Sequence, residues 1–137
     1  MEKIIVNADQ AILGRVSSYI AKELLKGKNI EVINCEKILV SGNKNNFVKN
    51  VLKKRRMGRG ASLKGPKYIR KEDMFVKRII RGMLPWDRPK GREAFSRLKC
   101  YIGENGFSGE SLKQAKTFSH QIPSTNFTIK EAMKLIR

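Results

Sequence analysis

Two short β-branched runs separated by one amphipathic helical segment constrain the fold of this chain more than any other feature. Residues 4–7 are apolar and β-branched, and residues 30–34 return to the same pattern. Between them, apolar residues recur at helical spacing from Leu13 to Leu25, and Gly27 supplies a C-terminal stop. A strand, a helix and a strand within about thirty residues predict a right-handed parallel crossover. The chain should therefore open an α/β sheet.

The mixed pattern continues as far as residue 103. Residues 38–40 predict a further strand, closed by Ser41 and Gly42, and a helix should follow with Phe47, Val48, Val51 and Leu52 on one face. The next helix should begin near Glu72 and end before Pro85. Its residues at core spacing are Phe75, Val76, Ile79, Ile80 and Met83. A turn over 86–90, a short helix over 92–98 and a last strand over 99–102 complete the sheet domain.

The last third of the chain has a different composition. Residues 104–126 are polar and rich in Gly, Ser, Thr and Asn, which favours an extended arm. Thr128 and Glu131 have capping-box spacing ahead of Ala132, Met133 and Ile136, so a short terminal helix should dock. The sequence thus predicts an α/β domain over 1–103, followed over 104–137 by an arm and a short terminal helix.

The balance of charge points to a polyanionic partner. Thirty Lys and Arg against twelve Asp and Glu give a formal net charge of +18, which opposes compaction unless an anion is bound. No apolar run approaches the roughly eighteen residues of a membrane span, so nucleic acid is favoured over membrane. The first residues run directly into strand-like sequence and lack the pattern of a secretory signal, so we expect a cytosolic protein.

The sharpest local signal is a basic stretch without compensating acids. From Lys37 to Lys71 there are twelve Lys or Arg and no Asp or Glu, and a glycine-containing loop is predicted over 57–66. Arg binds phosphate in a bidentate fork, and a supple loop can follow an irregular RNA backbone. A solvated charged face is the alternative, but such faces interleave both signs. This stretch therefore favours RNA binding.

A second basic cluster extends from Lys77 to Lys99 and surrounds the single tryptophan. Pro85 and Pro89 restrict the backbone of the corner between them, which should hold the nearby cations in a fixed arrangement. Trp86 could stack on a base or could simply cover the end of the preceding helix, and both interpretations remain open.

Enzyme and metal readings find little support in the sequence. Cys35 and Cys100 stand in apolar, strand-like settings and are too few for structural zinc, so we interpret them as small buried hydrophobes. His120 lies in the polar tail without a neighbouring nucleophile. The glycines at 58, 60 and 65 match no cofactor fingerprint. No catalytic residue, cofactor or metal is predicted.

Three segments together resemble the universal large-subunit ribosomal protein thirteen family, in its archaeal and eukaryotic branch. They are Leu13-Gly14-Arg15, Ile33-Asn34-Cys35-Glu36 with Gly42, and Gly82-Met83-Leu84-Pro85 continuing through Lys90-Gly91-Arg92 to Gly103. The resemblance implies a three-layer α/β/α domain with a small, mainly parallel sheet. It also implies binding to large-subunit ribosomal RNA through Arg15, Arg55, Arg56, Arg59, Arg81, Arg88, Lys90 and Arg92. The charge pattern adds Lys44, Lys53, Lys54, Lys64, Lys67 and Arg97 to the predicted RNA-binding set.

The function predicted on these grounds is a structural component of the large ribosomal subunit in the cytoplasm. Its expected partners are large-subunit ribosomal RNA and neighbouring ribosomal proteins, with no membrane and no small-molecule substrate. Two alternatives compete with this hypothesis. A free nucleic-acid-binding regulator should offer a groove-reading helix or a dimer seam, and an α/β enzyme acting on RNA should carry a cofactor fingerprint or a carboxylate pair.

Overall fold

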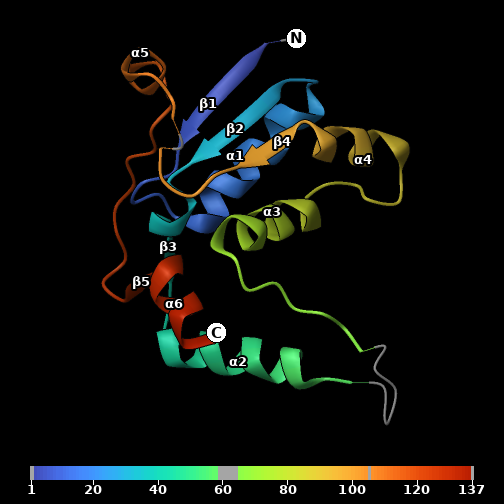
Figure 1. The fold of residues 1–137 in the computed structure, drawn as a ribbon, viewed down its shortest axis with the longest axis vertical. Helices are drawn as coiled ribbons and strands as arrows, with labels where there is room; N and C mark the ends of the chain where they lie inside the picture. Colours follow the sequence, from blue (N-terminus) through green and yellow to red (C-terminus); the bar gives the residue numbers. More distant parts are fainter. Residues whose placement is uncertain (1, 59–64, 105, 137) are drawn as a thin grey trace.

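The computed structural model describes residues 2–58, 65–104 and 106–136. Its elements in chain order are β1 (Lys3–Asn7), α1 (Leu13–Leu25), β2 (Asn29–Ile33), a short 3-10 helix (Cys35–Lys37), β3 (Leu39–Ser41), α2 (Lys44–Arg56), α3 (Glu72–Gly82), α4 (Pro89–Ser96), β4 (Leu98–Cys100), α5 (Gly109–Lys113), β5 (Asn126–Thr128) and α6 (Ile129–Ile136). Figure 1 shows their arrangement. Within the described ranges, no helix is long and apolar enough to cross a membrane.

The main sheet contains three parallel strands in the order β1-β2-β4. β2 lies in the centre, so Ile30 pairs with Ile4 on one side and with Leu98 on the other. The predicted strand–helix–strand crossover is confirmed, because β1 and β2 are parallel neighbours joined through α1. Gly27 ends that helix at φ +94, a left-handed conformation that most residues with a Cβ adopt only with strain.

Helices cover the two faces of this sheet unequally. α1 packs against α3, α4 and β2, while α3 and α4 also pack against β4 (Figure 1). The strands turn Val6, Ile30, Val32 and Leu98 toward this side, and all four are fully buried. On the opposite face, Glu31 of β2 pairs in register with Lys99 of β4, and Lys99 is exposed. The mixed α/β class with a small parallel sheet is confirmed, and its core lies between the sheet and these three helices.

The C-terminal segment returns to the body and completes the core. Lys116 exchanges backbone hydrogen bonds with the edge of β1, at 2.9 Å to both Ile5 and Asn7. Farther on, β5 pairs antiparallel with β3 and leads directly into α6. α6 is the predicted terminal helix, and Ala132, Met133 and Ile136 are buried in it as expected.

The predicted cap of the terminal helix is confirmed on the threonine side. The backbone amide of Glu131 donates to Oγ1 of Thr128 at 3.3 Å. The Glu131 carboxylate lies 3.8 Å from Nζ of Lys44, so its ion-pair contact reaches α2. The C-terminal helix is therefore tied to α2 by charge as well as by packing.

The structure corrects the sequence prediction around residues 83–98. Met83 was expected in the core but is 41% exposed, because α3 ends at Gly82 and Leu84 occupies the buried position instead. The helix predicted over 92–98 begins earlier, at Pro89. Proline at the first helical position already has the helical φ, so the predicted turn is shortened to residues 86–88.

The two cysteines lie side by side on the buried side of the fold. Cys35 is fully buried and Cys100 is half-buried, and both thiols are free. A hydrogen bond with the Cys100 thiol and burial together raise the pKa of Cys35. The Cys35 thiol therefore stays protonated and packs as a small apolar group, as the sequence predicted.

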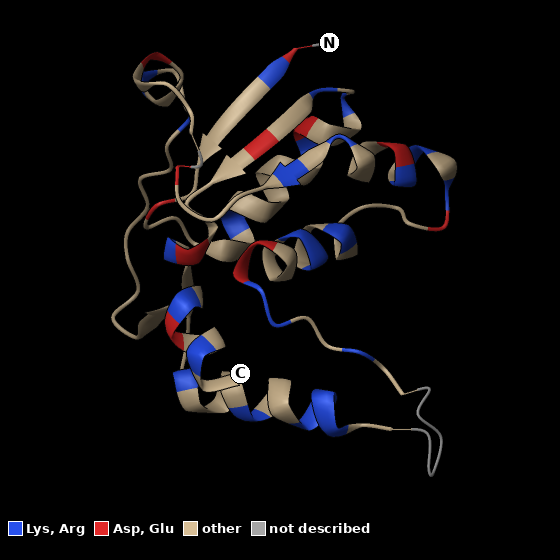
Figure 2. Ribbon diagram, in the orientation of Figure 1, with Lys and Arg blue, Asp and Glu red and all other residues tan. Residues whose placement is uncertain are grey.

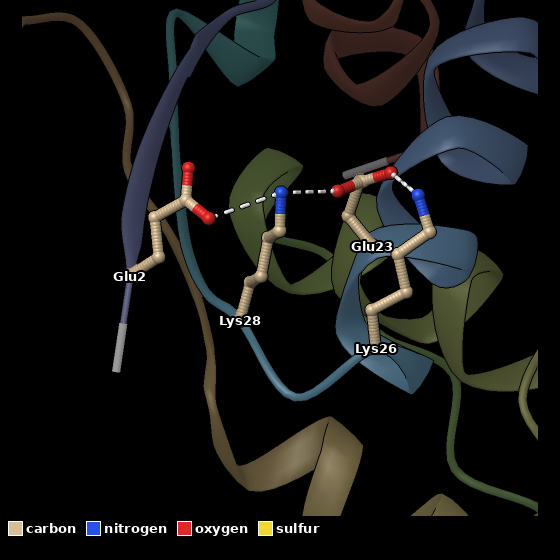
Figure 3. Close-up of polar contacts among 4 residues, drawn as sticks. All are labelled: Glu2, Glu23, Lys26 and Lys28. Atoms are coloured by element: carbon tan, nitrogen blue, oxygen red, sulfur yellow. Dashed lines mark hydrogen bonds and ion pairs between the residues drawn. The ribbon is translucent and has the colours of Figure 1, made fainter.

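A cluster of charges closes the end of the sheet where α1 turns into β2. Figure 3 shows Lys28 between two carboxylates, 2.9 Å from Glu23 and 3.2 Å from Glu2, while Lys26 lies 2.6 Å from Glu23. Hydrogen bonds from Lys26 and Lys28 lower the pKa of Glu23 to about 2, and those from Lys28 to Glu23 and Glu2 raise the pKa of Lys28. The acids of this region are thus neutralised within the protein.

The lowered pKa of Glu23 predicts how stability depends on pH. Its folded-state pKa of about 2 lies below the ordinary 4.5, so its stabilising contribution is complete above pH 4.5 and is lost as the pH falls toward 2. We expect the free energy of unfolding, measured in urea, to fall more steeply over this range for the wild type than for Glu23→Gln. Lys28→Met should flatten the profile in the same direction. Parallel profiles for the wild type and Glu23→Gln would contradict this assignment.

The burial of α6 predicts a large cost for truncating its inner face. Met133 is fully buried, so Met133→Ala should lower the free energy of unfolding by about 2 to 5 kcal/mol. Leu135 on the same helix is 55% exposed, and Leu135→Ala should change it by less than about 0.5 kcal/mol. Denaturant unfolding monitored by circular dichroism measures both. Equal effects of the two substitutions would mean that α6 is only loosely attached.

Candidate nucleic-acid interface

The predicted RNA-binding residues gather mainly on the helices beside the sheet. Lys44, Lys53, Lys54, Arg55 and Arg56 lie on α2, Lys67 lies in the segment that leads into α3, and Arg81 lies on α3. Arg88, Lys90, Arg92 and Arg97 lie on or beside α4, and Arg15 lies in the first turn of α1. Figure 2 shows the basic residues along α2, the segment before α3, and α3 itself. Arg59 and Lys64 fall outside the described residues.

Most cations of the predicted set lie away from the ion pairs that the structure describes. The ion pairs that the structure describes join Lys3, Lys26, Lys28 and Lys44 to Glu2, Glu23, Glu31 and Glu131. Within the described part of the chain, Lys44 is the one member of the predicted set that is paired with a carboxylate. Exposed cations of the set that form no described contact, such as Lys53, Lys54 and Arg56, are available to an external anion, in keeping with the lack of acids between residues 37 and 71.

A basic groove runs along the face of α2. It encloses about 620 Å³ and has Val48, Leu52 and Met57 as its apolar lining. Its polar residues are Asn45, Lys49, Asn50, Lys53 and Arg56, and we call the whole the α2 groove. Lys49 was not in the predicted set, although its helical spacing of four residues from Lys53 was readable in the sequence. Three cations along one helix face suit the regular spacing of a phosphate backbone.

Arg55 differs from its neighbours on α2, because its guanidinium turns toward the protein. Nη1 donates a hydrogen bond to the carbonyl oxygen of Ile136, at the C-terminal end of α6. The last carbonyls of a helix have no partner within the helix and carry partial negative charge, so a cation there is stabilising. Arg55 therefore joins α2 to α6, and its charge is already engaged within the protein.

Two further arginines of the predicted set also hold the fold together. Nη2 of Arg97 donates to the carbonyl oxygen of Leu24 at 2.9 Å, at the end of α1. Nε of Arg92 donates to the carbonyl oxygen of Trp86 at 3.0 Å, across the corner between α3 and α4. Sequence reasoning could not separate these residues from cations without a partner in the protein, because their acceptors are backbone carbonyls distant in the chain or within a turn.

The corner between α3 and α4 is tightly packed. A Cβ added to Gly91 would lie 2.0 Å from the carbonyl oxygen of Pro85, a contact that no side chain tolerates. The amide of Arg88 also donates to that carbonyl oxygen at 3.1 Å. Lys90, which the sequence placed in the turn over 86–90, belongs to α4 instead, because that helix begins at Pro89. Arg88 and Lys90 are the exposed cations here that form no described side-chain contact.

Trp86 packs against the protein and also borders a surface hollow. Its ring meets Phe95 edge-on, with centroids 5.3 Å apart and planes at 89°, and the Arg81 guanidinium lies 4.1 Å from the ring centre. The adjoining hollow of about 230 Å³, here called the Trp86 hollow, is lined by Ile69, Met74, Lys77, Arg78, Arg81, Trp86 and Phe95. Lys77 and Arg78 were not in the predicted set, although the sequence placed both in the second basic cluster.

Arg15 and Lys67 stand apart from the sites just described. Arg15 is exposed on α1 and lines neither the α2 groove nor the Trp86 hollow. Lys67 is exposed and borders a small hollow that it shares with Arg78. The structure thus brings the described set together in two places, at α2 and around the α3–α4 corner.

Comparison with known proteins relates the chain to one family. The family model described as "Ribosomal protein L13" matches residues 1–106. The chain is 37% identical to the "Large ribosomal subunit protein uL13" of Methanocaldococcus jannaschii over 133 residues, which cover 95% of this chain and 94% of that protein. The protein of the same name from Methanopyrus kandleri is 47% identical over 102 residues, 74% of this chain and 63% of the relative. That from Methanococcus maripaludis is 45% identical over 102 residues, 73% of this chain and 74% of the relative.

The hydrogen bond of Arg55 predicts a structural rather than a binding defect. A hydrogen bond from a charged donor contributes more than a neutral one, so Arg55→Gln should lower the free energy of unfolding by about 1 to 3 kcal/mol. Lys54→Gln, an exposed neighbour on the same helix, should change it by less than about 0.5 kcal/mol. Urea unfolding of both variants measures the difference. If the two variants are equally stable, the contact with α6 contributes nothing and Arg55 is available to RNA.

Proposed function

The chain belongs to the ribosomal protein L13 family, and we propose that it is a structural component of the large ribosomal subunit in the cytoplasm that binds ribosomal RNA. On this proposal the protein catalyses no reaction, and its partners are large-subunit ribosomal RNA and adjacent ribosomal proteins. The match covers 63% of the Methanopyrus kandleri relative's length and 94% of the Methanocaldococcus jannaschii relative's length, so the role is argued for the shared part.

The observation that carries the proposal is the separation of charge. The ion pairs of Glu2, Glu23 and Glu31 with Lys3, Lys26 and Lys28 lie at one end of the sheet. Among the described residues, the cations of α2 other than Lys44 form no ion pair, and neither do those of the α3–α4 corner, although Asp87 and Glu93 lie in that corner. Bringing so many like charges together raises the free energy of the isolated protein, and an RNA backbone offsets that cost by supplying phosphates.

The residues we assign to phosphate contacts are those that the fold leaves unengaged. They are Lys49, Lys53, Lys54 and Arg56 on α2, Lys67 before α3, Arg78 on α3, and Arg88 and Lys90 at the start of α4. Phosphate contacts orient the protein on RNA, whereas base contacts supply sequence information. Arg55, Arg92 and Arg97 contribute to RNA binding indirectly, because their hydrogen bonds hold in place the helices that carry the contacting residues.

The free nucleic-acid-binding regulator is the weaker alternative. It shares the charge, but the relatives are named as ribosomal proteins, and the basic residues here are spread over α2, α3 and α4. A surface composed of several helices suits an irregular RNA fold better than it suits one groove of a regular duplex. Sedimentation distinguishes the two, because a ribosomal component from cell lysate travels with large subunits and a regulator travels in the light fractions.

The α2 groove predicts the salt dependence of RNA binding. About eight phosphate contacts give a slope of log affinity against log salt near −6 on transcribed large-subunit ribosomal RNA. Removing three of the groove's cations in Lys49→Gln/Lys53→Gln/Arg56→Gln should make the slope shallower by about two to three units and reduce incorporation into large subunits in competition with wild type. Binding titrations from low to high salt measure the slope.

A control with the same loss of charge tests whether position matters. Lys22→Gln/Lys113→Gln/Lys134→Gln removes three exposed cations from α1, α5 and α6. It should leave the slope within about one unit of the wild type and preserve incorporation. Equal losses in the two triple variants would mean that net charge alone drives binding. A slope near zero in the wild type would overturn the electrostatic basis of the proposal.

A further inference from the structure

The Trp86 hollow combines features that simple phosphate binding does not require. Met74 is 49% exposed in it, an unusual exposure for a large apolar side chain amid so many cations. Phe95 and Trp86 provide aromatic walls at right angles to each other. The volume of about 230 Å³ exceeds the roughly 150 Å³ of a cavity that accepts one benzene ring. The hollow is therefore large enough and apolar enough to hold a flat ring.

A second, more polar hollow adjoins the first along the indole. It encloses about 400 Å³ and shares Arg78, Arg81 and Trp86 with the Trp86 hollow. Its lining includes Asp87, which is the one acidic residue in either lining, against three cations in the two together. Trp86 thus stands between two hollows. The first has the aromatic and apolar walls that a base would favour, while Arg78 and Arg81, which line both hollows, provide the positive charge that a phosphate would favour.

The cations around the aromatic rings are held in place before any ligand arrives. The Arg81 guanidinium stacks on Trp86 at 4.1 Å, and Nζ of Lys77 lies 5.1 Å from the centre of the Phe95 ring. Arg92 fixes the backbone of Trp86 through the hydrogen bond to its carbonyl oxygen. Such preorganisation lowers the entropy lost on binding. A guanidinium also offers planar surfaces on which a base can stack.

We propose that the Trp86 hollow holds one unstacked nucleotide of the bound RNA, with its base against the aromatic and apolar walls and its phosphate beside Arg78. The inference rests on the proposed function, because it assigns one contact of the same RNA. The base packs against Phe95 and Met74, and Arg81 and Trp86 close the site. Single-stranded RNA is recognised in this way, by aromatic and guanidinium surfaces that receive splayed-out bases.

The single tryptophan of the chain makes the proposal directly measurable, since all tryptophan fluorescence comes from Trp86. Three probes separate base from phosphate: single-stranded hexaadenylate, an abasic ribose-phosphate hexamer, and a fully paired RNA duplex of twelve base pairs. Hexaadenylate should change the fluorescence intensity saturably. The abasic hexamer and the duplex should bind through charge and leave the emission nearly unchanged, because neither supplies an unstacked base.

Phe95→Leu tests the aromatic wall while keeping the position apolar. Stacking on one aromatic side chain contributes about 1 to 3 kcal/mol per base, so hexaadenylate affinity should fall by about fivefold to a hundredfold. Binding of the abasic hexamer should change by less than about twofold, which also verifies that the variant is folded. Phe107→Leu, which removes another half-buried ring near Tyr101, is the matched control and should retain hexaadenylate affinity.

The results that overturn the inference differ from those that overturn the proposed function. Equal fluorescence changes with hexaadenylate and the abasic hexamer, or unchanged hexaadenylate affinity in Phe95→Leu, would exclude a nucleotide from the hollow. The ribosomal RNA salt slope would stand in either case, and an apolar group of a neighbouring protein would then fit the hollow better. Failure of the wild type to bind any of the three probes or ribosomal RNA would overturn both.

Discussion

The position of β2 between two parallel neighbours is the constraint on which the rest of the structure depends. Ile30 and Val32 pair with β1 through a local crossover and with β4 through a connection of more than sixty residues. Both residues are completely buried, so the register of the sheet cannot shift without exposing them. Because β4 must reach this register, α3 and α4 are drawn against α1, and the corner that joins them is brought to the surface beside the core.

The same arrangement distributes the charge. The pairing of β1 with β2, and the turn from α1 into β2, place Glu2, Glu23 and Glu31 beside Lys3, Lys26 and Lys28. The acids are neutralised there by ion pairs within the protein. The strongly basic helix α2 lies outside the sheet and contacts the body through α6 and through Phe47, whose ring meets Phe75 of α3 and Phe127 of β5. The charges at one end of the sheet are therefore paired within the protein, whereas the exposed cations of α2 are free to contact an external anion. On the proposed function, stability and RNA binding depend on different sets of charges.

The arginines illustrate why charge in a sequence is not equivalent to a binding site. Arg55, Arg92 and Arg97 each donate to a backbone carbonyl and thereby fasten α6, the α3–α4 corner and α1. Their side chains look the same in the sequence as those of Arg56 and Arg88, which are exposed. Only the location of a carbonyl acceptor distinguishes a structural arginine from one that is available to phosphate. The same holds for Gly91, whose close contact with the Pro85 carbonyl leaves no room for a side chain and is visible only in the structure.

The sequence by itself determined the local elements and indicated a polyanionic partner. Periodicity, glycine stops and capping residues are local signals, so β1, α1, β2, α2 and the terminal helix were predicted close to their observed bounds, and net charge does not depend on the fold at all. The tertiary structure decided what lies next to what: β5 beside β3, the buried face of α6 in the common core, Met83 at the surface, and Trp86 between two hollows. These contacts join residues far apart in the chain, and their free energy comes from burial and backbone hydrogen bonding, which no short window of sequence records.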